Sequence, residues 1–244
     1  MVKFIGLTKE VFLSEYISLF RFTTIDRFLE LLTNECLVFL NPSTWRDPYE
    51  RYYIERQYNI SNESKALPMK DKVFCLCLSG TKSSEAFWKV YAPKEDGVRL
   101  TINVLKLISA LEKIKGCDIY IGKVNYQTTR EFSKITIKYG DLIEDIKQNN
   151  IGDQQLKLIL KKRMSFNYEN EVRIIAIPHK TPKESLAFKS KMNIKSFTTE
   201  YLFDPRLGEY HFKLIRDFMG KGYGLKASYS YLYRNPPLSP IVLG

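Results

Sequence analysis

The chain has 244 residues, of which 44% are hydrophobic and 27% are charged, close to the average for globular proteins. These values exclude a disordered, collagenous or coiled-coil chain. No apolar run approaches the roughly 20 residues that cross a bilayer, no signal-peptide core follows the first methionine, and four cysteines do not make a disulfide framework. We therefore expect one cytoplasmic domain, residues 1–244, with no membrane partner.

The charge is less ordinary, because 38 lysines and arginines outnumber 27 acidic residues and give a net charge of +11. The chain also has 16 tyrosines and 15 phenylalanines. A basic surface with aromatic side chains suits a polyanion whose bases can stack on them. A basic protein with its aromatic residues in the core would have the same composition, so composition alone leaves contact with nucleic acid open.

In the first part of the chain, short apolar runs predict strands. Residues 19–23 are expected to form the first strand, and Thr24 begins a helix whose apolar side chains recur on one face. The wholly apolar runs 36–40 and 73–78 are typical of fully buried strands, with a polar loop at 59–71 between them.

Farther along, Ser83 or Ser84 can cap a helix that carries Phe87, Trp88 and Tyr91. The later predicted elements are, in chain order, a strand at 98–102, a helix at 103–115, a strand from 119, two helices within 130–163 around a turn at 149–152, strands at 171–177, 196–203 and 225–230, and a helix at 208–219 between the last two strands. The lysine-rich stretch 180–195 is expected to be a solvated hairpin or an electrostatic footprint. This mixture indicates an α+β fold and is too rich in strands for a helical bundle.

Several classes of enzyme lack the residues that they need. His179 and His211 are the only histidines, and neither lies in a recognisable triad setting. Cys75 and Cys77 share one face of a predicted strand, but no second cysteine pair completes a zinc site, so we expect buried structural thiols and no metal. Neither a phosphate-binding lysine loop nor a glycine-rich dinucleotide turn is present.

The best catalytic candidates are Glu169 and Glu171, which precede the apolar strand predicted at 171–177. Two carboxylates two residues apart point the same way if the strand has begun and diverge if it has not. Glu171 opens that strand and would be held on a rigid element at the edge of the sheet. From spacing alone, ion pairing with Arg173 or with the basic run 161–163 is the commoner role of such carboxylates.

Further candidates could bind a ligand. Arg21 is flanked by phenylalanines on a strand, where it faces either solvent or an anion such as a diphosphate. Ser79 and Thr81 follow a buried strand together with a glycine, which lets a ligand approach the backbone closely. Trp88 and Tyr91 lie one helical turn apart, either as stacking faces for a flat heterocycle or as core residues.

Ordered sequence blocks across nearly the whole chain resemble a widespread bacterial family of unknown function. The blocks are FRFTTIDRFLELLTNECLVFLNPSTWRDPYE (20–50), FCLCLSGTKSSEAFWKVYAPKEDGVRLTI (74–102), YENEVRI (168–174), LFDPR (202–206) and SYSYLYR (228–234). Two positions depart from the family pattern: Arg46 replaces an asparagine before Asp-Pro, and Leu78 replaces a phenylalanine before serine.

Arg21, Ser79 and Glu171 also resemble the ordered Arg–Ser–Glu signature of ADP-ribosyltransferases, although only Ser79-Gly80-Thr81 stands where many members have Ser-Thr-Ser. This resemblance implies a mixed, largely antiparallel split sheet with flanking helices, and NAD as substrate. Arg21 would contact the diphosphate, and Ser79 and Thr81 would support the ribose. Trp88 or Tyr91 would press on a ring of NAD. Glu171 would hold the ribose 2′-hydroxyl and oppose the positive charge that develops on the ribose, while Glu169 would accept a proton from the nucleophile or orient it.

Relatives of this kind include a phage-defence toxin of a toxin–antitoxin–chaperone system that ADP-ribosylates messenger RNA. The resemblance therefore implies a mono-ADP-ribosyltransferase that modifies nucleic acid, RNA above all, as a toxin or anti-phage effector, with an antitoxin protein as a further candidate partner. Two alternatives stay open at this point. One is a non-catalytic basic protein that binds RNA or DNA, and the other is a metal-dependent nuclease built on Asp47, Glu50, Glu169 and Glu171.

Overall fold

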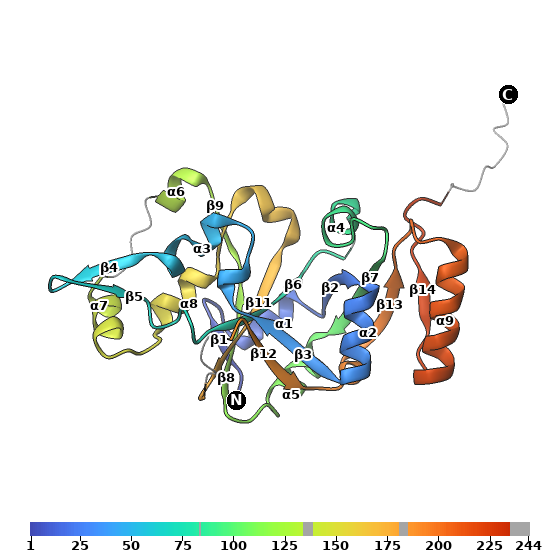
Figure 1. The fold of residues 1–244 in the computed structure, drawn as a ribbon, viewed down its shortest axis with the longest axis horizontal. Coiled ribbons are helices and arrows are strands. Elements are labelled where there is room, and N and C mark those ends of the chain that lie inside the picture. The colour runs from blue at the N-terminus through green and yellow to red at the C-terminus, as the bar shows by residue number, and fades with distance from the viewer. Residues whose placement is uncertain (83, 134–138, 181–184, 235–244) are drawn as a thin grey trace.

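The computed structural model describes residues 1–82, 84–133, 139–180 and 185–234 (Figure 1). Within these ranges, one large mixed sheet organises the chain, with helices packed around it. Its main path runs, in spatial order, through β1 (Lys3–Ile5), β8 (Cys117–Lys123), β11 (Glu171–Pro178), β6 (Phe74–Ser79), β2 (Ser18–Thr24), β7 (Gly97–Asn103), β13 (Thr198–Phe203) and β14 (Ala227–Tyr229). The expectation of a mixed sheet with flanking helices is confirmed.

The remaining strands form a branch and two short ribbons. In the branch, β3 (Cys36–Leu40) pairs with β6 and with β12 (Ala187–Lys191). One ribbon joins β4 (Gln57–Ile60) to β5 (Glu63–Ala66), and the other joins β9 (Asn125–Gln127) to β10 (Lys161–Arg163).

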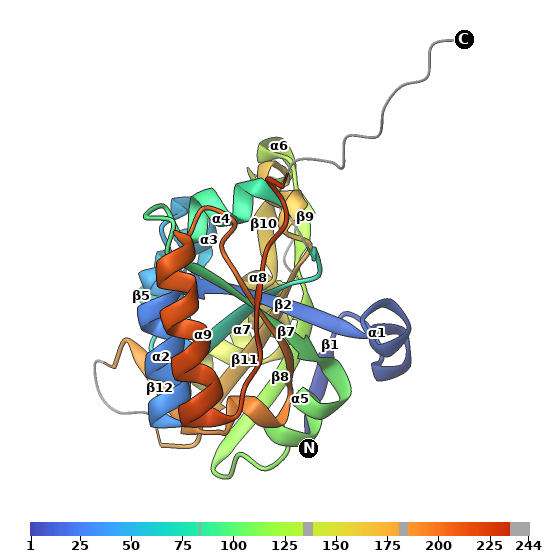
Figure 2. The same cartoon turned by 90° about the vertical axis from the view of Figure 1, so that its right-hand side faces the viewer.

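The helices lie on both faces of the sheet and at its ends. The α-helices are α1 (Lys9–Glu15), α2 (Ile25–Asn34), α3 (Pro48–Glu55), α4 (Glu85–Tyr91), α5 (Val104–Leu111), α6 (Thr129–Ser133), α7 (Tyr139–Lys147), α8 (Asp153–Ile159) and α9 (Glu209–Tyr223), and the 3-10 turns are η1 (Pro42–Thr44), η2 (Met164–Glu169) and η3 (Ile194–Ser196). Figure 1 shows α9 beside β14 at one end of the sheet, with α7 and α8 at the opposite end of the molecule, and Figure 2 views the molecule from the end at which α9 lies. None of the described helices combines the length and the apolar character that a membrane crossing needs.

The sheet opens beside β6. This strand pairs along its length with β11 on one edge, but its other edge is shared between β2 and β3. The β2–β6 contact is a single residue pair, Phe20 with Ser79, and the β3–β6 contact is Leu40 with Cys75. The strands β2 and β3 therefore diverge from a common neighbour, because β3 meets β6 at Cys75 and β2 meets it at Ser79.

Alternation along β11 divides the core into two layers. Val172 and Ile174 belong to the larger cluster, which also packs against α2 and α5. Ile175 points to the other face and joins residues of α3 and α8. Because both faces of this strand are covered, Val172, Ile174 and Ile175 are fully buried, as the sequence predicts, and Ile177 near its end is partly buried.

Most predicted elements are present, and the exceptions have identifiable causes. The predicted loop 59–71 is wrong in part, because Ser61 and Asn62 adopt positive φ and close a β4–β5 hairpin of polar residues. The stretch 180–195 contains β12, which pairs with β3 in the large sheet instead of forming a solvated hairpin, and residues 181–184 lie outside the described ranges. Ser83 also lies outside them, and Ser84 caps α4 by accepting from the Ala86 N–H at 3.2 Å.

Candidate active site

Two of the site candidates, Ser79 and Glu171, share one row across the sheet. Ser79 of β6 pairs with Glu171 of β11 on one side and with Phe20 of β2 on the other. Because directly paired residues of antiparallel strands project to the same face, Glu171, Ser79 and Phe20 stand side by side. Together with Cys77, Glu169 and Tyr91 they border a cavity of about 50 Å³.

Aromatic rings form one wall of this cavity. Phe22 of β2 stacks on Phe87 of α4, with ring centroids 4.6 Å apart and planes inclined by 16°. Tyr91 continues the stack, 5.9 Å from Phe87, and 40% of its surface is exposed. Trp88 is only 2% exposed and meets the ring of Phe22 edge-on from behind, so it supports the wall without facing the cavity. This geometry does not favour the expectation that Trp88 offers its ring to a ligand.

Beneath the cavity lies a buried ionic network of three carboxylates and two cations. The Lys162 ammonium contacts Glu169 at 2.8 Å, Glu171 at 2.9 Å and Glu50 at 3.2 Å. The Arg173 guanidinium donates to both oxygens of Glu171 (2.8 and 3.1 Å) and to Glu50 (3.0 Å). Each carboxylate has cationic partners, yet negative charge remains in excess under the cavity.

The two cations of the network come from adjoining elements. Strand β10 places Lys162 toward the carboxylates, and alternation on β11 puts Arg173 on the same face as Glu171. The Arg173 guanidinium also lies 4.1 Å from the centre of the Trp45 ring and donates to the carbonyl oxygen of Ile159. These contacts hold the guanidinium plane in one orientation.

The network drives the pKa values of Glu169 and Glu171 in opposite directions. Burial alone would raise the pKa of Glu171, but the charges of Arg173 and Lys162 outweigh it and lower this pKa to about 2. Burial raises the pKa of Glu169, and Lys162 offsets this only in part. Two neighbouring carboxyl groups with opposed pKa shifts are an arrangement found where one stays ionised while the other exchanges a proton.

The turn that carries both glutamates is hydrogen-bonded to the end of β6. The Ser79 hydroxyl donates to the Glu169 carbonyl oxygen (2.6 Å) and accepts from the Thr81 N–H (2.9 Å). The Thr81 hydroxyl donates to the Tyr168 carbonyl oxygen at 2.9 Å. Ser79 and Thr81 thus hold the turn in place, and of the two only Ser79 lines the cavity.

Between the glutamates, Asn170 takes a left-handed conformation with φ 42° and ψ 54°, which asparagine tolerates better than most residues. Its carbonyl oxygen accepts from the Gly80 N–H at 2.8 Å, and its side-chain oxygen accepts from the Tyr16 hydroxyl at 3.1 Å. The Glu171 N–H donates to the Tyr126 hydroxyl at 2.8 Å.

Arg21 does not line the cavity. It pairs with Leu100 of β7 and projects to the face opposite Phe20, behind the row that holds Ser79 and Glu171. Its Nη1 is buried and has no hydrogen-bond partner among the described residues. Burial lowers the pKa of Arg21 to about 10, and Cys77 of the cavity is near enough to counter this in part. Its role as an anchor for a diphosphate stays a prediction.

Sequence reasoning considered Lys162, within the basic run 161–163, and Arg173 only as alternative ion-pair partners of the two glutamates, and both do pair with them. It did not predict that Lys162 also joins Glu50 to the network. The spacing Glu-x-Glu-x-Arg on one strand was a usable signal for Arg173, because alternate residues share a face. Lys162 gave no such signal, because it comes from a separate short strand of basic residues.

The nuclease alternative receives no support from the arrangement of carboxylates. Glu50, Glu169 and Glu171 do converge, but the Lys162 ammonium occupies their meeting point, and Asp47 instead pairs with Arg163 at 3.1 Å. In the described ranges, no group of three or more histidine, cysteine, aspartate or glutamate side chains is placed to hold a metal ion. Cys75 is buried as expected, whereas Cys77 is exposed on the cavity side, so the expectation for that thiol is wrong.

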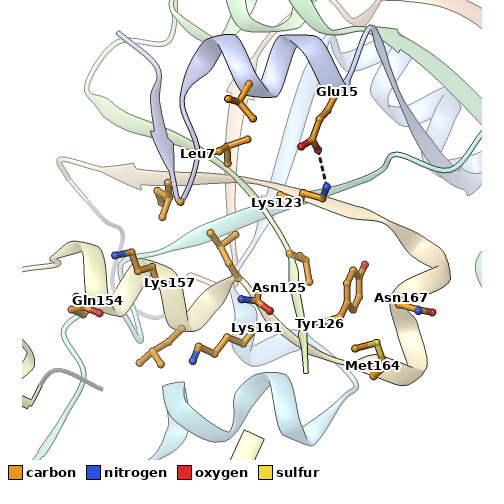
Figure 3. Close-up of a pocket in the computed structure, with 16 residues that line it drawn as sticks. Leu7, Glu15, Lys123, Asn125, Tyr126, Gln154, Lys157, Lys161, Met164 and Asn167 are labelled. Carbon is orange, nitrogen blue, oxygen red and sulfur yellow. Dashed lines mark hydrogen bonds and ion pairs between the residues drawn. The ribbon is translucent and has the colours of Figure 1, made fainter. Parts of the chain in front are cut away.

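Figure 3 shows a second, much larger cavity of about 920 Å³. It is bordered by the β1–α1 connection, the end of β8, β9, α8 and η2. Tyr126 lines this cavity, and its hydroxyl is the group that accepts from the Glu171 N–H.

Residues 87–174 match the family described as protein of unknown function DUF2971, a range that includes Glu169 and Glu171 but not Arg21 or Ser79. No curated protein matches the chain. Among solved structures, Thermus sp. 2.9 DarT in complex with ADP-ribosylated ssDNA is similar, with a TM-score of 0.41, 9% identity, and coverage of 88% of this chain and 94% of that one. The same Thermus protein in complex with NAD+ gives a TM-score of 0.39, 9% identity, and coverage of 88% and 95%.

Proposed function

We propose that the protein is an NAD-dependent mono-ADP-ribosyltransferase that modifies nucleic acid, with RNA as the first acceptor to test. The observation that carries this proposal is the pair Glu169 and Glu171, which line one aromatic cavity with opposed pKa shifts. TM-scores near 0.4 are too low to support a function, so the argument comes from the cavity itself.

Glu171 is suited to oppose positive charge on a substrate. Its carboxylate is buried, stays ionised down to a pKa of about 2, and is fixed by Arg173 and Lys162. Such a preorganised charge stabilises a cationic transition state more than a mobile one in water does. NAD supplies a ribose on which positive charge develops as its bond to nicotinamide breaks, with the bonding electrons leaving on nicotinamide.

Glu169 is suited to take up a proton. Its raised pKa lies closer to neutral pH than that of an ordinary glutamate, which improves a general base. The nucleophilic hydroxyl or amine of the acceptor forms its new bond to the ribose carbon and gives its proton to Glu169. Lys162 contacts both glutamates, so it can accommodate the change in charge that follows.

The other cavity residues fit a dinucleotide by their chemistry. Phe22, Phe87 and Tyr91 offer aromatic surface to a flat ring. Arg21 lies on the other face of β2, outside the cavity, so its contact with a diphosphate stays a prediction. The cavity volume of about 50 Å³ is close to that of one or two water molecules, each ~30 Å³. Entry of a nucleotide therefore requires this cavity to widen.

The decisive experiment incubates the protein with NAD labelled on the adenylate and with single-stranded RNA or DNA, and measures label on the nucleic acid. Wild type should transfer label, and Glu171→Gln should reduce the rate by about 10²–10³, the usual effect of removing one preorganised electrostatic group. Glu112→Gln is the matched control, because Glu112 is exposed at the end of α5. Thermal unfolding of both variants verifies that they fold.

Two outcomes would contradict the proposal. One is a folded wild type that neither transfers label nor hydrolyses NAD. The other is nucleic-acid binding and growth arrest of expressing cells that survive both Glu171→Gln and Arg21→Gln, which would favour the non-catalytic binding protein. Growth arrest that depends on Glu171 would support action as a toxin or phage-defence effector.

A further inference from the structure

The larger cavity, of about 920 Å³, has a distinctive charge distribution. Its border includes Lys123, Lys157 and Lys161 against a single glutamate, Glu15, which pairs with Lys123 at 2.7 Å. Lys157 and Lys161 have no carboxylate within ion-pair distance in the part of the chain that the structure describes. Burial lowers the pKa of the half-buried Lys161, and no acidic neighbour counters this. An anion bound here would offset the unfavourable burial of the Lys161 charge.

The rest of the lining can hold a heterocycle. Val11 of α1 and Met164 of η2 are exposed apolar side chains that border the cavity. The amides of Asn125, Gln154 and Asn167 also face it, and such groups read the edges of bases by paired hydrogen bonds. Figure 3 shows Lys157 and Lys161 on one side, with Tyr126, Met164 and Asn167 on the other. A volume of this size is typical of a small-molecule or nucleotide site.

Two elements connect this cavity to the carboxylates. The turn η2 begins with Met164, which borders the large cavity, and ends with Glu169, which borders the small one. Tyr126 lines the large cavity while its hydroxyl accepts from the Glu171 N–H. In β10, Lys161 faces the large cavity and the adjacent Lys162 faces the carboxylates. A ligand in the large cavity therefore lies next to the turn that would perform the chemistry.

We propose that this cavity binds a segment of single-stranded nucleic acid and so holds the acceptor strand beside Glu169. Phosphates would contact Lys157 and Lys161, and a base would lie against Met164 and the amides. This inference rests on the proposed function for the identity of the strand as acceptor, but binding itself can be measured without NAD.

The test is fluorescence anisotropy of a labelled single-stranded RNA or DNA oligonucleotide over a range of salt concentrations. Lys157→Gln combined with Lys161→Gln should weaken binding about tenfold or more at low salt. It should also reduce the slope of log affinity against log salt by about 0.7 for each phosphate that the variant no longer neutralises. The matched control is Lys213→Gln combined with Lys221→Gln, two exposed lysines of α9 at the opposite end of the sheet. The control should bind like wild type.

Competing occupants give different results. Equal losses of affinity in the test and control variants would show general electrostatic attraction and overturn the inference. A parallel loss of NAD affinity in the test variant would assign the cavity to NAD, and equal competition by poly-glutamate would assign it to acidic peptides. AMP that binds as tightly as the oligonucleotide would identify a free nucleotide as the ligand. The wild type could also show no transferase activity while the Lys157/Lys161 variant still loses oligonucleotide binding. That result would support the binding site and refute only the proposed function.

Discussion

At the scale of single residues, Glu169 and Glu171 differ because their partners differ. Glu171 is ion-paired with Arg173 and Lys162, while Glu169 is ion-paired with Lys162 alone and lies near two other carboxylates. Both are buried, so desolvation acts on both, and the number of cationic partners decides the sign of each pKa shift. The same pair of side chains thus provides a permanent anion and a proton acceptor.

This difference predicts the pH dependence of transfer. Glu169 must be ionised to accept a proton, so the rate should rise with pH through a pKa above 4.5, its ordinary value. This rise is the acid limb of the pH profile. Glu169→Gln should remove the acid limb and slow transfer by a factor of about 10²–10⁴. Because the charge of Lys162 lowers the pKa of Glu169, Lys162→Met should move the limb to higher pH. The measurement is the initial rate of transfer between pH 4 and 9.

A matched variant, Glu131→Gln, removes an exposed carboxylate of α6 and should leave the limb in place. An acid limb that persists unchanged in Glu169→Gln would assign the titration to another group. A limb that moves to lower pH in Lys162→Met would refute the electrostatic explanation.

At the scale of elements, the turn between η2 and β11 depends on close contact with the end of β6. A Cβ added to Gly80 would lie 2.7 Å from the Tyr16 ring and would overlap the Asn170 amide. Neither neighbour can yield freely, because the two are hydrogen-bonded to each other. Glycine at this position therefore permits the approach that positions the glutamates.

Gly80→Ala should consequently lower both stability and activity. Forcing extra atoms into a packed site typically costs ~1–3 kcal/mol of unfolding free energy, and displacement of the turn should reduce transfer more than binding of the acceptor. Urea unfolding and label transfer measure the two effects. Gly220→Ala is the control: a Cβ there meets no atom within 4 Å in α9, so stability should rise by up to ~1 kcal/mol. Equal stability and activity in Gly80→Ala and wild type would contradict this account of the turn.

Elements with strong apolar patterns were predictable. The strands β3, β6 and β11 are nearly continuous runs of apolar residues, and their predicted bounds are within one residue of those observed. Full burial was wrong for β3, where Leu37 and Phe39 are buried on one face but Leu40 is exposed. The β4–β5 ribbon and β10 were not predictable, because their residues are largely polar and periodicity gives no signal. The β4–β5 pairing depends on the tight turn at Ser61 and Asn62, and β10 forms only by tertiary pairing with β9.

At the scale of the whole molecule, the site is produced by strand register. Sequence reasoning selected Ser79, Tyr91, Glu169 and Glu171, and the structure brings all four to one cavity. It could not place Arg21 relative to them, because a single residue of register decides which face of β2 carries the side chain. The contact between Glu50 and Lys162 was also not predictable from the sequence, because the two residues lie on α3 and β10 and meet only in the folded chain.

The buried network should also shape the acid stability of the whole fold. The folded pKa of Glu171, about 2, lies below its ordinary value of 4.5, so its ionisation stabilises the fold above pH 4.5. This contribution is lost as pH falls toward 2 and amounts to on the order of 3 kcal/mol. Glu169 acts with the opposite sign, because its raised pKa makes ionisation unfavourable in the folded state and its contribution is lost as pH rises.

Glu171→Gln should therefore be less stable than wild type at pH 7 but lose less stability between pH 4.5 and about 2. Urea unfolding at a series of pH values measures both effects, and Glu112→Gln should follow the wild-type curve because Glu112 is exposed. Parallel curves for wild type and Glu171→Gln would mean that Glu171 has the same pKa in the folded and unfolded chains. In that case the ion pairs with Arg173 and Lys162 would not keep it ionised, and its proposed role as the fixed negative charge of the site would fail as well.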